Sequence, residues 1–178
     1  IVPAVHTKSM APERTCETVS VSLPSCPLGY TSIVSRPFDS FRISAHARRE
    51  KSIRHGHIST LHIWWARRPL AAMRAAIFAS LIPAPRDEKE RAELHQLIGG
   101  TYNPQTDKWE GGITDWDEVK DGNSATIERA KALIAQCYPD SPPKVLDPFM
   151  GGGSTGLEAL RLGCEAHGVE LNPVAYLI

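Results

Sequence analysis

The chain has 178 residues, enough for one modest domain, and its acidic and basic residues balance to a formal net charge of zero, so net charge excludes no class of partner. No apolar run reaches the length of a membrane span, and no signal peptide opens the chain. Its cysteines, at positions 16, 26, 137 and 164, have neither metal-ligand spacing nor a disulfide framework, which favours a reducing compartment. We therefore expect a soluble, cytoplasmic protein.

Residues 1–40 are rich in serine, threonine and proline, and no helical or strand period persists along them. Residues 19–23 alternate briefly between apolar and polar side chains and are at most a weak strand. We expect a poorly structured arm here, without a role in the chemistry.

Residues 41–82 form a basic and aromatic segment, since residues 36–74 contain nine lysine or arginine residues and two acids, whereas residues 75–178 contain nine and sixteen. Such a face suits nucleic-acid contact, although an ordinary solvated surface fits equally well. The candidates for that contact are Arg54, Trp64, Trp65 and Arg67, through phosphate pairing and base stacking; loop anchors and surface charges are the alternative. Four histidines, at positions 46, 55, 57 and 62, lack a cysteine or carboxylate cluster, so we predict no metal site.

A helix is predicted to begin at Pro69 and to end before Pro83. Its apolar stripe packs on a core and comprises Leu70, Met73, Ile77 and Leu81, with Phe78 and Ile82 alongside.

Residues 83–143 are predicted to be a helical insertion. One helix covers residues 86–98 and stops at two glycines, a polar loop covers residues 101–122, and a second helix is capped by Asn123 or Ser124. The second helix ends before Pro139 and has an apolar stripe of Ile127, Ala130, Ile134 and Cys137. We interpret Trp109 and Trp116 in the polar loop as loop anchors, with contact to DNA as the alternative.

Residues 144–178 have the pattern of a βαβ nucleotide site and indicate an α/β fold. A buried strand ends at Asp147, and a glycine turn (residues 148–153) leads into a helix over residues 154–162, with Leu157 and Leu160 predicted to face the sheet. A second strand over residues 166–169 ends in Glu170. Asn172 and Pro173 then have the pattern of a helix cap and a first helical residue.

Three interpretations of the glycine turn are open. The spacing Gly151-x-Gly153-x-x-Gly156 fits a dinucleotide fingerprint, with Glu170 placed to hold a ribose, but Asp147 would repel a pyrophosphate. A phosphate-binding P-loop needs a lysine that is absent, and a turn with no ligand is the third possibility. A carboxylate at position 147 suits a cationic amino group, which favours S-adenosylmethionine.

Residues 147–155, Asp-Pro-Phe-Met-Gly-Gly-Gly-Ser-Thr, resemble the Asp-Pro-Phe-x-Gly-x-Gly-Thr-Thr motif of amino-group DNA methyltransferases, and residues 170–173 resemble their second motif. Departures are serine at 154 for threonine and glycine at 152 for serine. The resemblance implies a cofactor site of Asp147, Pro148, Phe149, Gly151, Gly153, Ser154, Thr155, Glu170, Leu171 and Asn172, in which Glu170 holds the ribose and Ser154 and Thr155 lie near the methionine carboxylate.

Residues 49–72, with the block Trp-Trp-Ala-Arg-Arg-Pro-Leu, resemble an uncharacterised domain that opens a family of bacterial adenine-specific DNA methylases, and the resemblance runs from about Phe41 to Ile178. In such enzymes a segment before the first motif lines the cofactor pocket, which implies a place there for Arg68 and Pro69. The implied fold is a partial Rossmann-like, S-adenosylmethionine-dependent methyltransferase domain with a helical N-terminal segment and a helical insertion.

The catalytic motif of that family, Asp/Asn/Ser-Pro-Pro-Tyr/Phe, does not occur in this chain, whose one Pro-Pro pair lies in Ser141-Pro142-Pro143-Lys144. We expect a chain cut at both ends that binds the cofactor but has no catalytic residues and does not methylate by itself. The expected target is an exocyclic amino group, that of adenine in DNA. A nicotinamide-dependent oxidoreductase and a non-enzymatic nucleic-acid-binding fragment are the alternatives.

Overall fold

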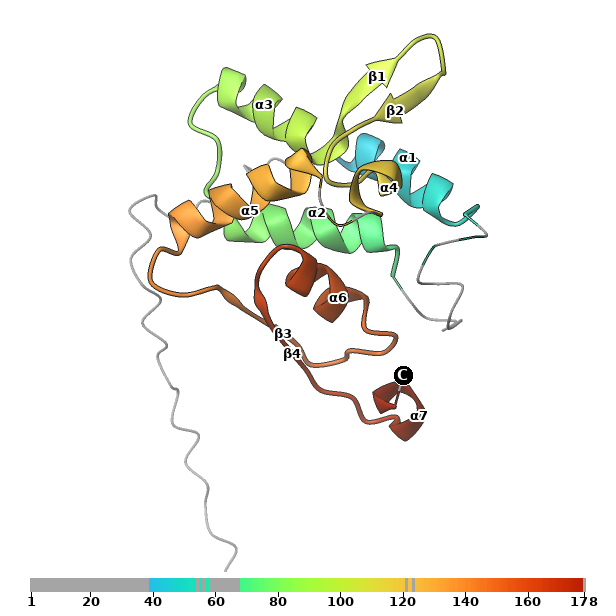
Figure 1. Cartoon of the computed structure of the whole chain (residues 1–178), viewed down its shortest axis with the longest axis vertical. Helices are drawn as coiled ribbons and strands as arrows, with labels where there is room; N and C mark the ends of the chain where they lie inside the picture. The colour runs from blue at the N-terminus through green and yellow to red at the C-terminus, as the bar shows by residue number, and fades with distance from the viewer. Residues whose placement is uncertain are drawn as a thin grey trace, which may run out of the picture.

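A computed structural model describes residues 39–53, 55, 57, 68–120, 122 and 124–177. Residues 1–38 of the expected arm over residues 1–40 lie outside this range, as do the candidates Arg54, Trp64, Trp65 and Arg67. Figure 1 shows α2 in the middle of the molecule, with helices and a hairpin on one side and a βαβ unit on the other. We call the described residues from 39 to 137 the helical part, and residues 144–168 the βαβ unit.

Helix α1 (Ser40–Glu50) begins directly after Asp39, whose carboxylate accepts hydrogen bonds from the backbone N–H groups of Phe41 and Arg42. One face of the helix is buried, at Ile43, His46 and Glu50. The sequence interpretation assigned no helix to this segment. The helix also takes in Ser40, the last residue of the expected arm.

Helix α2 (Leu70–Leu81) follows Pro69 and ends before Ile82 and Pro83, as predicted. It packs against α1, α5 and α6. Because it has neighbours on several sides, burial extends beyond the predicted stripe and includes Ala71, Arg74, Ala75 and Ala79, whereas Met73 and Leu81 are only half-buried.

The two predicted insertion helices are present as α3 (Glu88–Gly99) and α5 (Ala125–Cys137). The side chains of Asp87 and Ser124 cap them by accepting a hydrogen bond from a first-turn N–H group. In α5 the predicted stripe is buried at Ile127, Ala130 and Ile134 and half-buried at Cys137.

The prediction of a polar loop over residues 101–122 is wrong. The segment contains an antiparallel hairpin of β1 (Thr101–Asn103) and β2 (Lys108–Glu110), followed by the single-turn helix α4 (Trp116–Val119). Strands of three residues are too short to produce a clear alternating pattern. The turn between them is built locally, by Asp107 at φ 54° and by the Asn103 side chain, which accepts a hydrogen bond from the N–H of Gln105.

Both tryptophans of this segment pack against α1 or the residues after it. The guanidinium of Arg42 lies 4.4 Å from the centroid of the Trp109 ring, which also contacts Phe41 and Tyr102. The Trp116 ring lies 4.3 Å from that of His57. These contacts agree with the interpretation of Trp109 and Trp116 as anchors.

The βαβ unit consists of β3 (Lys144–Asp147), α6 (Ser154–Arg161) and β4 (Glu165–Gly168), with α7 (Pro173–Tyr176) following it. The two strands are parallel, with Lys144 opposite Glu165 and Asp147 opposite Gly168. These elements, the cap Asn172 and the first helical residue Pro173 confirm the local prediction. The prediction that the first strand is buried is wrong, because Val145 is half-buried and Leu146 is 64% exposed. Successive side chains of a strand point to opposite faces of the sheet, and among the described residues α6 packs on this sheet from one side. The wider Rossmann-like fold remains a prediction.

The prediction that Leu160 faces the sheet is wrong, because its side chain is 63% exposed, and Leu157 is half-buried. Helix α6 packs on α2 as well as on the two strands, and this double contact moves its buried face to Ser154, Gly156, Glu158 and Ala159. Most of the large exposed apolar side chains lie in or just after the βαβ unit: Leu146, Phe149, Leu160, Val169, Leu171, Val174, Tyr176 and Leu177. Among the described residues, the unit therefore packs through one face of its sheet.

No helix in the described part of the chain has both the length and the apolar character that a membrane span requires.

Candidate functional site

Two carboxylates stand at the same end of the parallel sheet. Asp147 is the last residue of β3, and Glu170 follows β4 by two residues, so both leave the sheet at the carboxyl ends of its strands. This end of an open parallel sheet is where α/β proteins bind their ligands. Oδ1 of Asp147 accepts a hydrogen bond of 3.0 Å from the N–H of Phe149, which starts the glycine turn.

The glycine turn is joined to the second strand by backbone hydrogen bonds. Met150 donates its N–H to the carbonyl of Val169 at 3.0 Å, and Val169 donates its own N–H to the carbonyl of Asp147 at 2.9 Å. Gly151 and Gly153 have φ values of 50° and 75°, in the left-handed region that favours glycine. Apart from Gly153 itself and the two residues next to it in the chain, no residue has an atom within 4 Å of where a β-carbon on Gly153 would be, so a ligand has room to approach the main chain there.

Glu170 closes the other side of the turn. Its Oε2 accepts a hydrogen bond of 2.6 Å from the N–H of Gly151, and its Oε1 accepts one of 2.8 Å from the N–H of Asn172. These N–H groups, first that of Asn172 and then that of Gly151, lower the pKa of Glu170, against the opposing effects of desolvation and of nearby Asp147. Each oxygen keeps a lone pair, so the ionised carboxylate can still accept hydrogen bonds from a ribose.

The start of α6 lies beside the main chain of Arg68. Ser154, the first residue of α6, is buried and donates its hydroxyl to the carbonyl of Arg68 at 3.1 Å. The sequence places these two residues 86 positions apart. The N-cap residue Gly153 supplies no side-chain hydrogen bond, so none caps the N–H groups at the helix start, and these favour an anion such as a carboxylate.

The predicted site residues therefore divide into two groups. The first group surrounds the glycine turn and comprises Asp147, Gly151, Gly153, Ser154 and Glu170. Three more residues adjoin this group: Thr155 follows Ser154 in α6, Arg68 accepts the hydrogen bond of Ser154, and Pro69 follows Arg68 in the chain. The second group consists of residues whose side chains are exposed or are used elsewhere. Pro148, Phe149 and Leu171 are exposed, the last two by 82% and 91%.

Asn172 belongs to the second group, because its side chain is used as a cap. Its Oδ1 accepts a hydrogen bond of 3.0 Å from the N–H of Val174 at the start of α7. The residue contributes to the site through its N–H, which binds Glu170.

A buried ion pair that the sequence interpretation missed joins α2 to α6, the helix that begins at the glycine turn. Arg74 of α2 and Glu158 of α6 bond through Nε and Oε2, and their side chains are 1% and 0% exposed. Arg74 also donates to the carbonyl of Ile113, and Arg161 pairs with Glu158 at 3.2 Å and donates to the carbonyl of Val119. The signal in the sequence is that Arg74 is the one charged residue in the apolar helix Leu70–Leu81.

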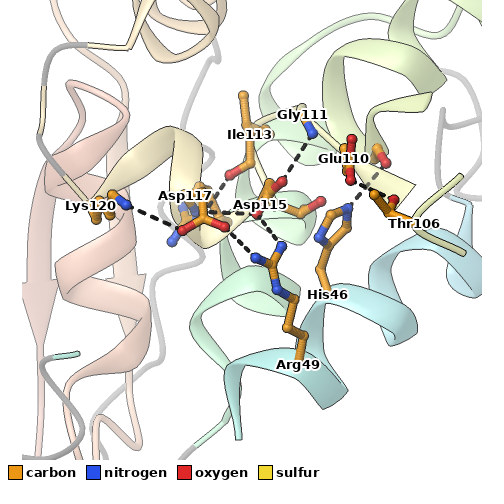
Figure 2. Close-up of polar contacts among 12 residues, drawn as sticks. His46, Arg49, Thr106, Glu110, Gly111, Ile113, Asp115, Asp117 and Lys120 are labelled. Atoms are coloured by element: carbon orange, nitrogen blue, oxygen red, sulfur yellow. Dashed lines mark hydrogen bonds and ion pairs between the residues drawn. The ribbon is translucent and has the colours of Figure 1, made fainter. Parts of the chain in front are cut away.

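A second polar cluster holds α1 to the segment that follows the hairpin (Figure 2). Arg49 reaches Asp115, at 3.1 Å, and Asp117, while Lys120 approaches Asp117 from the other side at 3.3 Å. Asp115 also accepts a hydrogen bond of 3.0 Å from the N–H of Gly111. Because each charged side chain is paired within the cluster, we assign the cluster a structural role.

Two buried histidines, His46 of α1 and His57 in the segment after it, are also engaged in packing. Nε2 of His46 lies 3.2 Å from the carbonyl oxygen of Gly99, and Nε2 of His57 lies 2.7 Å from Oε1 of Glu50. The other oxygen of Glu50 accepts a hydrogen bond from the N–H of Ala71 at the start of α2. Within the described ranges, no three histidine, cysteine or acidic side chains are grouped so that they could hold a metal ion.

Comparison with known proteins gives one match. Residues 38–99 match the model of a family described as "Protein of unknown function (DUF1156)". The matched region includes α1, α2 and α3, with Arg68, Pro69 and Arg74, and stops well before the glycine turn. No curated protein and no solved structure matches the chain.

Proposed function

We propose that this chain binds S-adenosylmethionine at the glycine turn and is the cofactor-binding part of a DNA methyltransferase that acts on an exocyclic amino group, that of adenine. The observation that carries the proposal is the pair of carboxylates, Asp147 and Glu170, at the carboxyl ends of two parallel strands beside a left-handed glycine turn.

The charge of the site supports this cofactor over a dinucleotide. S-adenosylmethionine carries a sulfonium and an ammonium group and so has a net positive charge, whereas a dinucleotide brings a pyrophosphate. Glu170 is held ionised by two backbone N–H groups and feels the charge of Asp147. Two such carboxylates attract the cation and repel the pyrophosphate. The uncapped start of α6 offers N–H groups for the methionine carboxylate.

The residues divide the binding work as follows. Asp147 holds the ammonium group, the N–H groups at the start of α6 and the hydroxyl of Thr155 hold the carboxylate, and Glu170 accepts hydrogen bonds from the ribose hydroxyls. The hydroxyl of Ser154 already donates its one hydrogen to the carbonyl of Arg68, so Ser154 positions the start of α6 and offers its N–H. S-adenosylmethionine supplies the methyl group. The motif that would accept the hydrogen bonds of the adenine amine does not occur in residues 1–178, so we assign no catalytic residue.

Isothermal titration of the 178-residue chain with S-adenosylmethionine, and separately with NADH, tests the proposal. We expect saturable binding of S-adenosylmethionine and no heat from NADH. Binding of NADH alone would contradict the proposal and favour an oxidoreductase.

Substitution of either carboxylate tests the assignment of roles. We expect Asp147→Ala and Glu170→Ala each to weaken binding of S-adenosylmethionine by at least about tenfold, because each removes a charged hydrogen-bond acceptor from the ligand. Glu165→Ala is the matched control, since it removes an exposed acid from the opposite end of β4. Unchanged affinity in either site variant would remove that residue from the site.

The DNA target is tested separately. If residues of the basic segment contact DNA, binding to duplex DNA weakens steeply as salt rises. A chain that binds DNA in this way, with the same affinity after Asp147→Ala and with no response to S-adenosylmethionine, would instead be a nucleic-acid-binding module.

A further inference from the structure

Met150 occupies a slot between the first turn of α6 and the end of β4. A β-carbon built at Gly168 would overlap the sulfur of Met150 and come within 2.9 Å of its Cγ, and a β-carbon built at Gly156 would overlap its Cε. Gly156 lies in α6 and Gly168 is the last residue of β4. The thioether therefore lies between the helix and the strand that flank the glycine turn.

The two glycines that form the slot provide space and not backbone freedom. Neither Gly156 nor Gly168 is among the described glycines with a positive φ, so an alanine could adopt either backbone conformation. A β-carbon at either position would instead displace the Met150 side chain. Glycine at these two positions thus accommodates Met150.

The backbone of Met150 is anchored on both sides of the slot. Its N–H binds the carbonyl of Val169 at 3.0 Å, and its carbonyl accepts the N–H of Gly153 at 2.9 Å. Gly151, the next residue, donates to Glu170 at 2.6 Å. The position of Met150 therefore decides how the turn meets Glu170 on one side and the start of α6 on the other.

We propose that Met150 is a positioning residue for the cofactor site, whose thioether, wedged between Gly156 and Gly168, sets the separation of α6 from β4 and so holds the glycine turn in the geometry that binds S-adenosylmethionine. The proposal rests on the proposed function. Methionine suits the role because its unbranched, flexible side chain fills an irregular gap, and no contact of Met150 with the ligand is invoked.

The test is isothermal titration of the 178-residue chain with S-adenosylmethionine, at a temperature at which circular dichroism shows each variant fully folded. Met150→Ala empties the slot and should raise Kd by about tenfold or more, because small misplacements of binding groups are costly. Met150→Leu keeps the volume and should stay within about threefold of the unsubstituted chain. Leu160→Ala, which removes an exposed side chain from α6, is the control and should leave Kd unchanged.

A double substitution tests the slot itself, because Gly168→Ala narrows the slot and Met150→Ala removes the side chain that fills it. Gly168→Ala should weaken binding in the unsubstituted chain, where its β-carbon displaces the thioether, and should weaken it little further when Met150 is already alanine. If the fold-changes in Kd of the two single variants instead multiplied in the double variant, the two substitutions would act independently and the slot would be contradicted.

The outcomes separate the two proposals. If the unsubstituted chain does not bind S-adenosylmethionine, the proposed function fails. If it binds, and the folded Met150→Ala variant binds with the same Kd but melts at a lower temperature, Met150 is only a packing residue and this inference is wrong.

Discussion

Glu170 contributes both to the negative charge of the site and to the shape of the glycine turn. Its carboxylate accepts one backbone N–H from the turn and one from the segment before α7, and these bonds lower its pKa. A carboxyl group whose pKa is lowered in the folded state adds stability above its unfolded pKa, and this stability is lost as the pH falls through the folded value. Acid should therefore loosen the turn at Glu170.

We predict that Glu170→Gln removes this part of the pH dependence. The unsubstituted chain should be more stable than the variant near neutral pH, and the difference should shrink as the pH falls below about 4.3, the ordinary pKa of glutamate. Urea unfolding of both chains at several pH values measures it. Glu165→Gln, in an exposed pair with Lys144 and His167, is the comparison. A difference that is constant from neutral to acid pH would contradict the role of the Glu170 charge.

At the scale of residues, the sequence predicted the parts of the site that are close along the chain. Asp147, Gly151 and Glu170 were found because strand, turn and strand follow one another within one unit. The place of Arg68 near the turn was implied only by the family resemblance. Its contact with Ser154 was not predicted, since it joins residues 86 positions apart. The slot around Met150 was not predicted, because it depends on the spacing between α6 and β4, which the pattern of residue types does not contain.

At the scale of elements, the joint between α2 and α6 is the main connection between the helical part and the βαβ unit. It combines close packing of the two helices with the buried pair Arg74–Glu158 and the hydrogen bonds of this pair to neighbouring groups. Breaking a buried pair by removing one partner leaves an uncompensated charge in the interior. The contact between α2 and α6 therefore tolerates replacement of both Arg74 and Glu158 better than replacement of one of them.

We predict that Arg74→Met and Glu158→Leu each lower the free energy of unfolding by about 3–5 kcal/mol, and that the double variant loses less than the sum of the two. Urea unfolding followed by circular dichroism measures all three. The control is Arg91→Met, which breaks an exposed pair with Glu88 and should cost at most about 1 kcal/mol. Additive losses at Arg74 and Glu158 would show that the pair does not act as a unit.

Elements with a side-chain cap and a long apolar stripe were predicted well, as α3 and α5 show. Helix α1 was missed because its buried residues include His46 and Glu50, which read as polar surface in the sequence. The hairpin was missed because each strand has three residues. In both cases tertiary contacts, and not local propensity, decide the structure.

At the scale of the whole molecule, the joint couples two parts that can be observed separately. All four tryptophans, at positions 64, 65, 109 and 116, precede the βαβ unit. Tryptophan fluorescence therefore reports on residues before that unit, whereas the proposed ligand binds at the unit. A ligand that binds only the folded state raises its stability by about 2.7 kcal/mol at roughly 100 times Kd.

We predict that saturating S-adenosylmethionine raises the unfolding midpoint seen by tryptophan fluorescence as much as that seen by far-ultraviolet circular dichroism. The reason is that α2 and α6 unfold together if the joint holds. Thermal unfolding of the same sample with both probes measures it. If the ligand shifted the circular dichroism transition and left the fluorescence transition in place, the two parts would unfold independently.

The pair Arg74–Glu158 also limits how this protein can be recombined. Arg74 lies within the region that matches the DUF1156 family, and Glu158 lies 84 residues further on, outside it. A chimera with a crossover between residues 99 and 144 takes the two charges from different parents. Such a graft needs an arginine from one parent and a glutamate from the other, or a pair of apolar residues in their place. A graft that keeps this buried pair intact therefore moves both regions together.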